Sequence, residues 1–398
     1  MDEIENSYER LIDHIVSNDR CGWDPYDGLN TPYALLTSTR SARLFSQYFH
    51  KFSPVNLRPL FGVRKSRQLQ AAAFIGLALE NYSGKGSRED FVREIVGDLK
   101  ASSMRDKYGY HCWDPHGFPI QMRKSYTPVG TTDVIGNEAC GRLLHRISER
   151  TGDEKAGTIA EDVARYIIKV LRVDKGDVAF FKYKPITPDW SCTYNASVLA
   201  AAFVTKVLGG NKLTDEECDF LERCFHYVCK NQRNEGYWCY SIDLRSGNEK
   251  HQVDFHQGFI LDCLLEYMQM TGFREPFVSA YRKGLRFYKE KQFFNDGRGI
   301  YRWPKIWPVN IHNQAQGIIT FSRACEVDPE YMEFSEKIAR WTIREMQHRN
   351  GHFYFMKYPM FKNKIPYIRW SDAAMAYALA VLLKARSSRG NVRLAPGG

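Results

Sequence analysis

Apolar and polar positions repeat along this chain with a period near sixty residues. A polar or aromatic residue followed by an apolar, helix-like run recurs at Asp133, Tyr194, Asp254, His312 and Ser371, at intervals of 61, 60, 58 and 59 residues. Stretches with a single apolar stripe, the pattern of a half-exposed helix, lie between these runs. They span 154–172, 214–231, 275–293 and 328–347. Each repeat therefore predicts a hairpin of one buried and one half-exposed helix.

Earlier segments extend the repeat toward the N-terminus. A helical pair over 33–50 and 66–82 and a helix over 87–103 raise the count to six inner and six outer helices. Six such hairpins can close into a ring, so the sequence predicts an all-α fold, an (α/α)6 toroid whose inner helices surround a funnel. Because the period runs through most of the 398 residues, we expect one domain over 1–386, followed by a disordered tail over 387–398.

A segment rich in aromatic, Gly and Pro residues precedes each of the later inner helices. Alternating residues favour short strands in these segments, and the prolines divide them. Because the segments fall at one phase of the repeat, we expect aromatic loops at one rim of the toroid, where their rings can contact a sugar. Packing of the rings as a plug in the funnel is the alternative. The segments are 108–119, 178–190, 235–247, 299–308 and 351–367.

The composition is that of a globular protein, with 43% hydrophobic and 26% charged residues. The net charge is +10, but the lysines and arginines are spread along the chain and form no nucleic-acid-binding motif. An acidic glycan in a basic funnel uses the same charge. We therefore expect an acidic saccharide as the partner and no nucleic acid.

The ten cysteines are scattered and include no Cys-x-x-Cys pair. Buried free thiols are the preferred interpretation, and a meeting of Cys192, Cys218 and Cys239 is the alternative. We expect no metal and no cofactor. The acidic first 17 residues do not resemble a signal peptide, and no apolar run is long enough to span a bilayer. We therefore expect a cytoplasmic protein without membrane insertion. The sequence leaves the oligomeric state open.

Polar groups stand at the starts of the predicted inner helices, where apolar residues would be expected. His256 and His312 are the only histidines at such starts, and histidine titrates near neutral pH. We expect both to transfer protons, with Asp254 or Asp372 orienting or charging one of them. Asp254 and His256 can share a site only if the helix begins between them, because residues two apart on a helix point about 200° apart. The more economical arrangement has His256 facing a neighbouring side chain such as His312, with Asp254 at the helix cap.

Other polar and aromatic residues are candidates for substrate contacts. Asp24 and Asp27 flank a Pro-Tyr turn and are either the acid and base of glycoside hydrolysis or turn formers. Arg58 and Arg369 can clamp a carboxylate, although surface charge is the alternative for Arg58. Trp113 and Trp303 can stack on sugar rings. Asp133, like Asp254, is alternatively a helix cap. The remaining candidates are Arg58, Arg369, Trp113, Trp303, Tyr194, Asn195 and Gln316.

Five motifs, in this order and spacing, resemble the polysaccharide-biosynthesis proteins of the Vibrio VpsJ type, which are often labelled delta-aminolevulinic acid dehydratase. The resemblance covers roughly residues 20–386 and implies an (α/α)6 toroid encoded among genes for exopolysaccharide, capsule or protein glycosylation. Where the family has His-Asn-Ala-Asn, this chain has Tyr194-Asn195-Ala196-Ser197. The motifs are DPYDGLN, NLRPLFGVRKSR, VDFHQGFILDCLLEYMQMTG, NIHNQAQGIITFSRA and NKIPYIRWSDAAMAYALAVLL.

The dehydratase label does not agree with the residues, because that enzyme class is a βα-barrel with Schiff-base lysines, and helices dominate here. The sequence favours a glycan-active enzyme that hydrolyses, eliminates from or epimerises a sugar, a uronic acid by preference. A toroid also resembles unsaturated glucuronyl hydrolases, uronate lyases and sugar 2-epimerases. The alternative is a non-catalytic glycan-binding component of a synthesis complex. A terpenoid cyclase would need an acidic DxDD-like motif, which the chain lacks.

Overall fold

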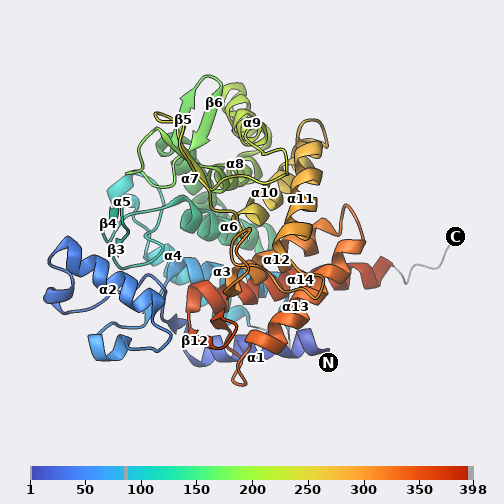
Figure 1. Ribbon diagram of the computed structural model, residues 1–398. Helices are drawn as coiled ribbons and strands as arrows, with labels where there is room; N and C mark the ends of the chain where they lie inside the picture. Colours follow the sequence, from blue (N-terminus) through green and yellow to red (C-terminus); the bar gives the residue numbers. More distant parts are fainter. Residues whose placement is uncertain (1, 85–87, 393–398) are drawn as a thin grey trace.

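The six inner helices form a closed ring. The computed structural model describes residues 2–84 and 88–392, and more than half of these are helical. Each inner helix packs against the next one, and the last packs against the first, which closes the ring (Figure 1). The fold is therefore the predicted (α/α)6 toroid. The inner helices are α3 (Leu69–Asn81), α6 (Val134–Thr151), α8 (Tyr194–Leu208), α10 (His256–Thr271), α12 (Ile311–Ala324) and α14 (Ala374–Val392).

The outer layer contains one helix that the periodicity did not place. The predicted helix over 33–50 is instead η1 (Ala34–Leu36) and α2 (Arg40–Phe52), and α2 packs on the strand β3 (Ile120–Gln121) outside the ring. The N-terminal helix α1 (Glu3–Ser17) takes the sixth outer position, against α13 and α14. The other outer helices are α4 (Glu89–Ala101), α7 (Glu154–Val170), α9 (Asp215–Lys230), α11 (Phe277–Gln292) and α13 (Glu330–Met346).

Side-chain burial explains this exchange of places. In α1, the side chains of Ile4, Tyr8 and Leu11 are fully buried, whereas the aromatic rings of Phe45 and Phe52 on α2 are more than half exposed. Burying apolar area in the ring is the main favourable term, so the helix with the continuous apolar stripe occupies the closing position.

The two ends of the predicted helical range also need correction. The helix α14 continues to Val392, so the first half of the tail predicted over 387–398 is helical. Residues 393–398 lie outside the described residues, as does residue 87, the first of the predicted helix 87–103, whose described part forms α4.

Small antiparallel sheets join the loops that precede the inner helices. The strands of 235–247 and 351–367 pair with strands that lead into α8 and α12, so neighbouring loops are stitched together; 108–119 and 299–308 form loops. The π-helical turn η4 (Ile368–Ala373) leads into α14. The remaining strands are β1 (Cys21–Gly22), β2 (Ser66–Arg67), β4 (Tyr126–Thr127), β5 (Arg172–Lys175), β6 (Val178–Phe181), β7 (Ser191–Thr193), β8 (Ser241–Asp243), β9 (Glu249–Lys250), β10 (Val309–Asn310), β11 (Tyr354–Lys357) and β12 (Lys362–Pro366).

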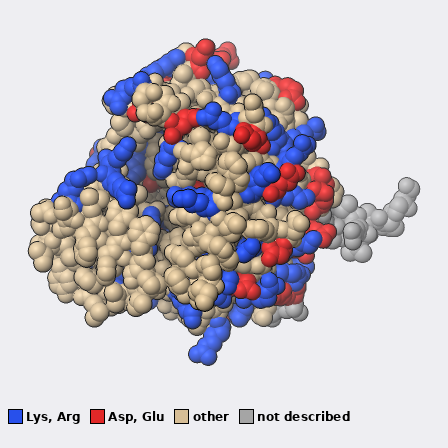
Figure 2. All heavy atoms as spheres, in the orientation of Figure 1, with Lys and Arg blue, Asp and Glu red and all other residues tan. Residues whose placement is uncertain are grey.

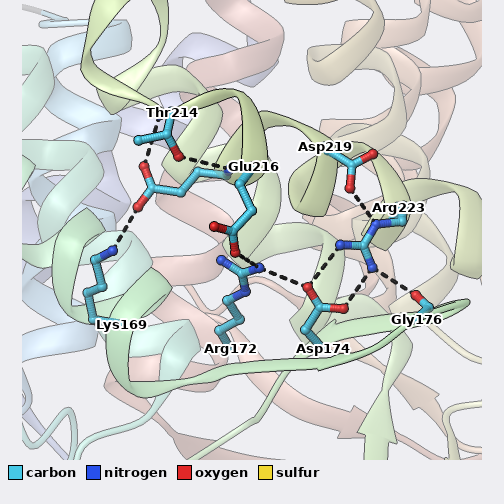
Figure 3. A network of polar contacts seen from close by, with 9 residues as sticks. Lys169, Arg172, Asp174, Gly176, Thr214, Glu216, Asp219 and Arg223 are labelled. Atoms are coloured by element: carbon cyan, nitrogen blue, oxygen red, sulfur yellow. Dashed lines mark hydrogen bonds and ion pairs between the residues drawn. The ribbon is translucent and has the colours of Figure 1, made fainter.

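An ion-pair network fixes the β5–β6 hairpin to the outer helix α9 (Figure 3). The guanidinium of Arg223 binds both carboxylate oxygens of Asp174 at 2.8 Å and also the carboxylate of Asp219 at 2.7 Å. Arg172 bridges Asp174 and Glu216 at 2.8 Å each. The hydrogen bonds from Arg223 and Arg172 hold the pKa of Asp174 below its usual range. The loop after α7 is therefore held in place by charge-assisted bonds.

Candidate functional site

A carboxylate and an imidazole meet at the start of α10. The helix begins at His256, so Asp254 precedes it and can turn back to the ring. Asp254 Oδ1 lies 2.5 Å from His256 Nδ1, and its other oxygen accepts from Arg302 Nε at 3.2 Å and Gln252 Nε2 at 2.9 Å. Burial alone would raise the pKa of Asp254, but the charges of His256 and Arg302 hold it below the ordinary value. The Asp254 carboxylate is therefore a charged acceptor that orients the imidazole of His256.

The dyad keeps one ring atom for a ligand. The Asp254 side chain is 2% exposed and the His256 side chain 14% exposed. Because Nδ1 faces the carboxylate, Nε2 is the nitrogen of His256 that can exchange a proton with a substrate. Tyr240 contacts the imidazole edge to face, with ring centres 4.7 Å apart.

His312 lies on the other side of one shared phenyl ring. The ring centre of Phe255 is 4.1 Å from that of His256 and 4.6 Å from that of His312. His312 Nδ1 lies 3.2 Å from the carbonyl oxygen of Trp370, whose indole packs on the imidazole at 4.7 Å. Burial, with the charges of Arg369 and His256, lowers the pKa of His312 to about 4. His312 is therefore neutral at pH 7, and with Nδ1–H donated to the carbonyl its Nε2 is an acceptor.

Cations surround this wall of the funnel. Lys250 lies over the ring of Tyr240 at 4.3 Å, and burial together with the charges of Arg302 and Lys51 lowers its pKa. Burial and the charge of Arg369 likewise lower the pKa of Lys184, which donates to Thr127 Oγ1 at 2.9 Å. Burial and neighbouring positive charges thus disfavour the charged forms of both lysines, and an anion placed beside them gains free energy.

Asp133 stands at the corresponding start of α6. Its Oδ1 caps the helix by accepting from Gly136 N at 2.8 Å, and its Oδ2 lies 3.5 Å from His116 Nε2. Burial would raise the pKa of Asp133, but the bond and charge of His116 and the charge of Lys184 lower it. The predicted cap is thus present, and the carboxylate also belongs to the charged lining.

Asp24 and Asp27 do not form a catalytic carboxylate pair in this structure. Both are buried and engaged in ion pairs: Arg369 grips both oxygens of Asp24 at 2.8 and 3.0 Å, and Arg58 Nε binds Asp27 at 2.7 Å. Arg58 is fully buried and donates further to the carbonyl oxygens of Asp24 and His50. The prediction that Arg58 clamps a saccharide is corrected: it ties residues 24–27 to the end of α2. Arg369 remains beside the site, with its guanidinium over the rings of Tyr26 and Trp370.

Several predicted contacts lie too deep for a ligand. Trp113 is fully buried and donates its indole N–H to the Leu99 carbonyl at 2.8 Å, so it cannot stack on a sugar. Tyr194 is fully buried and packs toward Tyr227 of α9, and Asn195 beside it is buried. Asp372 contacts neither histidine; it accepts from the backbone N–H of Phe353 at 2.8 Å, and burial raises its pKa to about 8.

Two further predicted residues are near the site without completing it. Trp303 is half-buried and packs between Tyr237 and Phe287, with ring centres 5.3 and 5.6 Å away. Gln316 is buried one turn below His312, where it donates to Asp262 at 2.8 Å. It lines a cavity of about 60 Å³ together with His312 and Phe259.

The site also contains residues that the sequence did not single out. Arg302 and Lys184 lie in rim segments that the sequence marked only as aromatic loops, and Trp370 stands next to the predicted Arg369. The sequence pattern that could have identified these three residues is a cation or an indole that recurs in the segments before the inner helices. Tyr240 and Lys250 come from the β7–β8–β9 sheet edge, which only the fold brings to the dyad.

The centre of the toroid is closed below the site by charged side chains. Arg142 binds Glu266 at 2.6 and 3.0 Å and also contacts Glu138, while Arg323 lies 3.5 Å from Asp262. A larger cavity of about 800 Å³ opens beyond them, at the C-terminal ends of the inner helices. The histidine dyad lies at the other end of the toroid, where the inner helices begin; we call this end the mouth.

The described chain contains no candidate for a metal centre or a membrane span. Residues 2–84 and 88–392 contain no cluster of three or more His, Cys, Asp or Glu side chains placed to hold a metal ion, and no disulfide joins their ten cysteines. No described helix is both long and apolar enough to cross a bilayer.

Comparisons with known proteins identify the fold. No protein-family model matches the chain, and no curated protein matches it either. Among solved structures it is similar to a sugar epimerase from a ruminal bacterium (13% identity, TM-score 0.61, covering 98% of this chain and 99% of that one). It is also similar to an unsaturated glucuronyl hydrolase specific for heparin (13%, 0.62, 97% and 98%) and to cellobiose 2-epimerase from Bacillus thermoamylovorans B4167 (12%, 0.63, 80% and 87%). At such identities the likeness establishes the shared toroid.

Proposed function

We propose that the protein acts on a saccharide by moving a proton at a sugar carbon, with His256 as the proton-transfer group. The observation that carries this is the Asp254–His256 contact at the mouth of the toroid. A carboxylate on Nδ1 fixes the tautomer and stabilises the imidazolium that forms when Nε2 accepts a proton. The neutral His312 beside it supplies a second nitrogen that can hold the sugar hydroxyl or take part in return of the proton.

The chemistry of the lining favours a uronic acid. Lys250 and Lys184 have no ion-pair partner in the described chain. The positive charge of a nearby arginine, Arg302 for Lys250 and Arg369 for Lys184, helps to lower the pKa of each lysine. A sugar carboxylate placed among these cations relieves their repulsion and is held electrostatically. Such a carboxylate also makes the neighbouring carbon–hydrogen bond more acidic, which is the step shared by C5 epimerisation and by elimination.

Hydrolysis by two carboxylates receives less support. It requires an acid and a base or nucleophile flanking the glycosidic bond. Asp24 and Asp27, the pair that the sequence offered, are buried in ion pairs with Arg369 and Arg58. The solved neighbours include both sugar epimerases and a glucuronyl hydrolase, so the fold accommodates either reaction.

The resemblance to the VpsJ-type proteins supports a role for this reaction in polysaccharide or glycoconjugate biosynthesis. The second candidate is a non-catalytic subunit that binds glycan chains during synthesis. The partly aromatic and cationic mouth serves both candidates. The dyad distinguishes them, because a binding module has no need of a carboxylate-oriented imidazole.

Deuterium exchange tests the proposal. Wild type, Asp254→Asn and His256→Gln are incubated with uronic-acid oligosaccharides in D₂O, and sugar products are analysed by mass spectrometry and NMR. We expect deuterium at a sugar carbon with wild type, and a rate lower by about 10²–10⁴-fold in both variants. His226→Gln is the matched control, because this exposed histidine of α9 is paired with Glu222 on the outer layer.

Each result has a distinct meaning. Deuterium with an unbroken chain identifies epimerisation, and an unsaturated product identifies elimination. Cleavage without deuterium would replace the proposal by hydrolysis. Binding of the oligosaccharide with no turnover, unchanged in His256→Gln, would favour the non-catalytic subunit.

A further inference from the structure

Residues 30–65, here called the N-terminal lobe, expose an unusual density of large apolar side chains. Leu35 is 82% exposed and Leu60 is 76% exposed. Both protrude from the short 3-10 turns η1 and η2 (Arg58–Phe61), which flank α2. Nearby, Met360 at the β11–β12 turn is 93% exposed. The other exposed members of this apolar patch are Tyr33, Phe45, Phe52, Val55 and Phe361.

Contacts between neighbouring residues link several parts of this patch. Phe45 stacks on Phe49 at 5.4 Å, and Phe49 packs on Phe61 at the same distance. Tyr33 lies against Gly62, where an added Cβ would approach its ring to 2.9 Å. Asn363 donates to the Ser53 carbonyl at 3.3 Å, which brings the β11–β12 hairpin beside the end of α2.

The chain around the patch has cations and no acidic residue. Between Asp27 and Glu80 there is no Asp or Glu, and the same holds between Glu345 and Asp372. Arg40, Arg43 and Arg64 belong to the first of these stretches and form no ion pair within the described residues. Figure 2 agrees: the lower-left region, where Figure 1 draws α2, is almost free of red atoms and borders a hollow lined by Lys and Arg.

We propose that the N-terminal lobe docks on a lipid bilayer that carries anionic head groups. Protruding leucine, phenylalanine and methionine side chains enter the head-group region of a bilayer, and nearby Lys and Arg bind the anionic lipids. A second copy of this chain fits less well, because a two-fold interface would place this cationic surface against itself. The lobe borders the mouth of the toroid, so docking brings that mouth to the membrane surface.

Vesicle flotation tests the proposal with the full-length protein. The probes are vesicles of phosphatidylcholine alone and of phosphatidylcholine mixed equally with phosphatidylglycerol. We expect binding to the mixed vesicles only, and loss of binding at about 1 M salt, where the Debye length is about 3 Å. Leu35→Ser/Leu60→Ser should weaken partitioning by at least about tenfold. Arg40→Gln/Arg64→Gln should weaken it by about fivefold for each cation removed.

Phe273→Ser is the matched control for the apolar change. Phe273 is 58% exposed, as is Phe45, but it lies after α10 at the opposite end of the toroid, and its substitution should leave flotation unchanged. Wild type that stays with neither vesicle, or variants that float like wild type, would overturn the proposal. A dimer in sedimentation velocity that Leu35→Ser/Leu60→Ser abolishes would assign the patch to a second copy instead. Because the replaced side chains are exposed, circular dichroism should show an unchanged fold.

Discussion

Replacement of Arg58 should reduce the stability of the protein and not its affinity for saccharide. In Arg58→Met, Asp27 loses the guanidinium 2.7 Å away, and the carbonyl oxygens of Asp24 and His50 lose donors at 2.9 and 3.3 Å. Breaking a buried pair on one side typically costs about 3–5 kcal/mol. Burial already raises the pKa of Asp27 to about 7, so protonation of the lone carboxyl limits the loss. We expect the free energy of unfolding to fall by about 3 kcal/mol at pH 7.

A double-mutant cycle isolates the ion pair. Asp27→Asn keeps an acceptor for the backbone N–H of Asp24, which lies 2.9 Å from Asp27 Oδ2. Urea unfolding of both single variants and of the double variant should show a coupling of about 1–3 kcal/mol. Arg93→Met, which breaks an exposed pair with Asp90, should cost under about 1 kcal/mol. Additive effects at Arg58 and Asp27 would refute the structural role, and a folded Arg58→Met with weakened uronic-acid binding would restore the substrate-contact interpretation.

Three further predictions concern buried groups. Burial raises the pKa of Asp372 from 3.8 to about 8. The protonated carboxyl therefore contributes its full stability below about pH 4, and this contribution is lost as the pH rises toward 8. In urea unfolding, the free energy of unfolding should fall between pH 6 and pH 8 by roughly 2 kcal/mol more in wild type than in Asp372→Asn. Trp370→Leu opens the wall around His312, and NMR titration should show its pKa rising from about 4 toward the ordinary 6.5. Trp113→Phe loses the bond to Leu99 and should lower the unfolding free energy by about 1–2 kcal/mol, with saccharide affinity by calorimetry unchanged.

The periodic pattern was sufficient to predict the closed ring but not the helix in its sixth outer position. Inner helices such as α8 are apolar on almost every side, which sequence shows directly. The contact that places α1 against α14 joins segments more than 350 residues apart, and no period links the first residues of the chain to the last. The sequence therefore assigned the sixth outer position to the nearer helix α2.

The sequence offered the Asp254–His256 dyad as one of two arrangements, and it did not predict the buried ion pairs. Asp254 and His256 are two residues apart, so their meeting depends only on where α10 begins. The pairing of Arg369 with Asp24 spans 345 residues, and nothing local distinguishes an arginine that binds a ligand from one that binds its own chain. The predicted sugar contact of Trp113 was wrong for a similar reason, because its indole N–H donates to a carbonyl oxygen inside the core.

The direction of the inner helices accounts for the difference between the two ends of the toroid. The dyad, His312 and Asp133 all stand at helix starts, whereas the 800 Å³ cavity is lined by the last turns of the same helices. Helix N-termini carry about half a positive charge each, so several of them aimed at one mouth add to the field of Lys184 and Lys250. Acidic side chains at that mouth, Asp133 and Asp254, are each held by a neighbouring histidine. Under the proposed function, a sugar carboxylate would meet the cations and helix dipoles first, and the imidazole of His256 would then take the proton from the carbon beside that carboxylate.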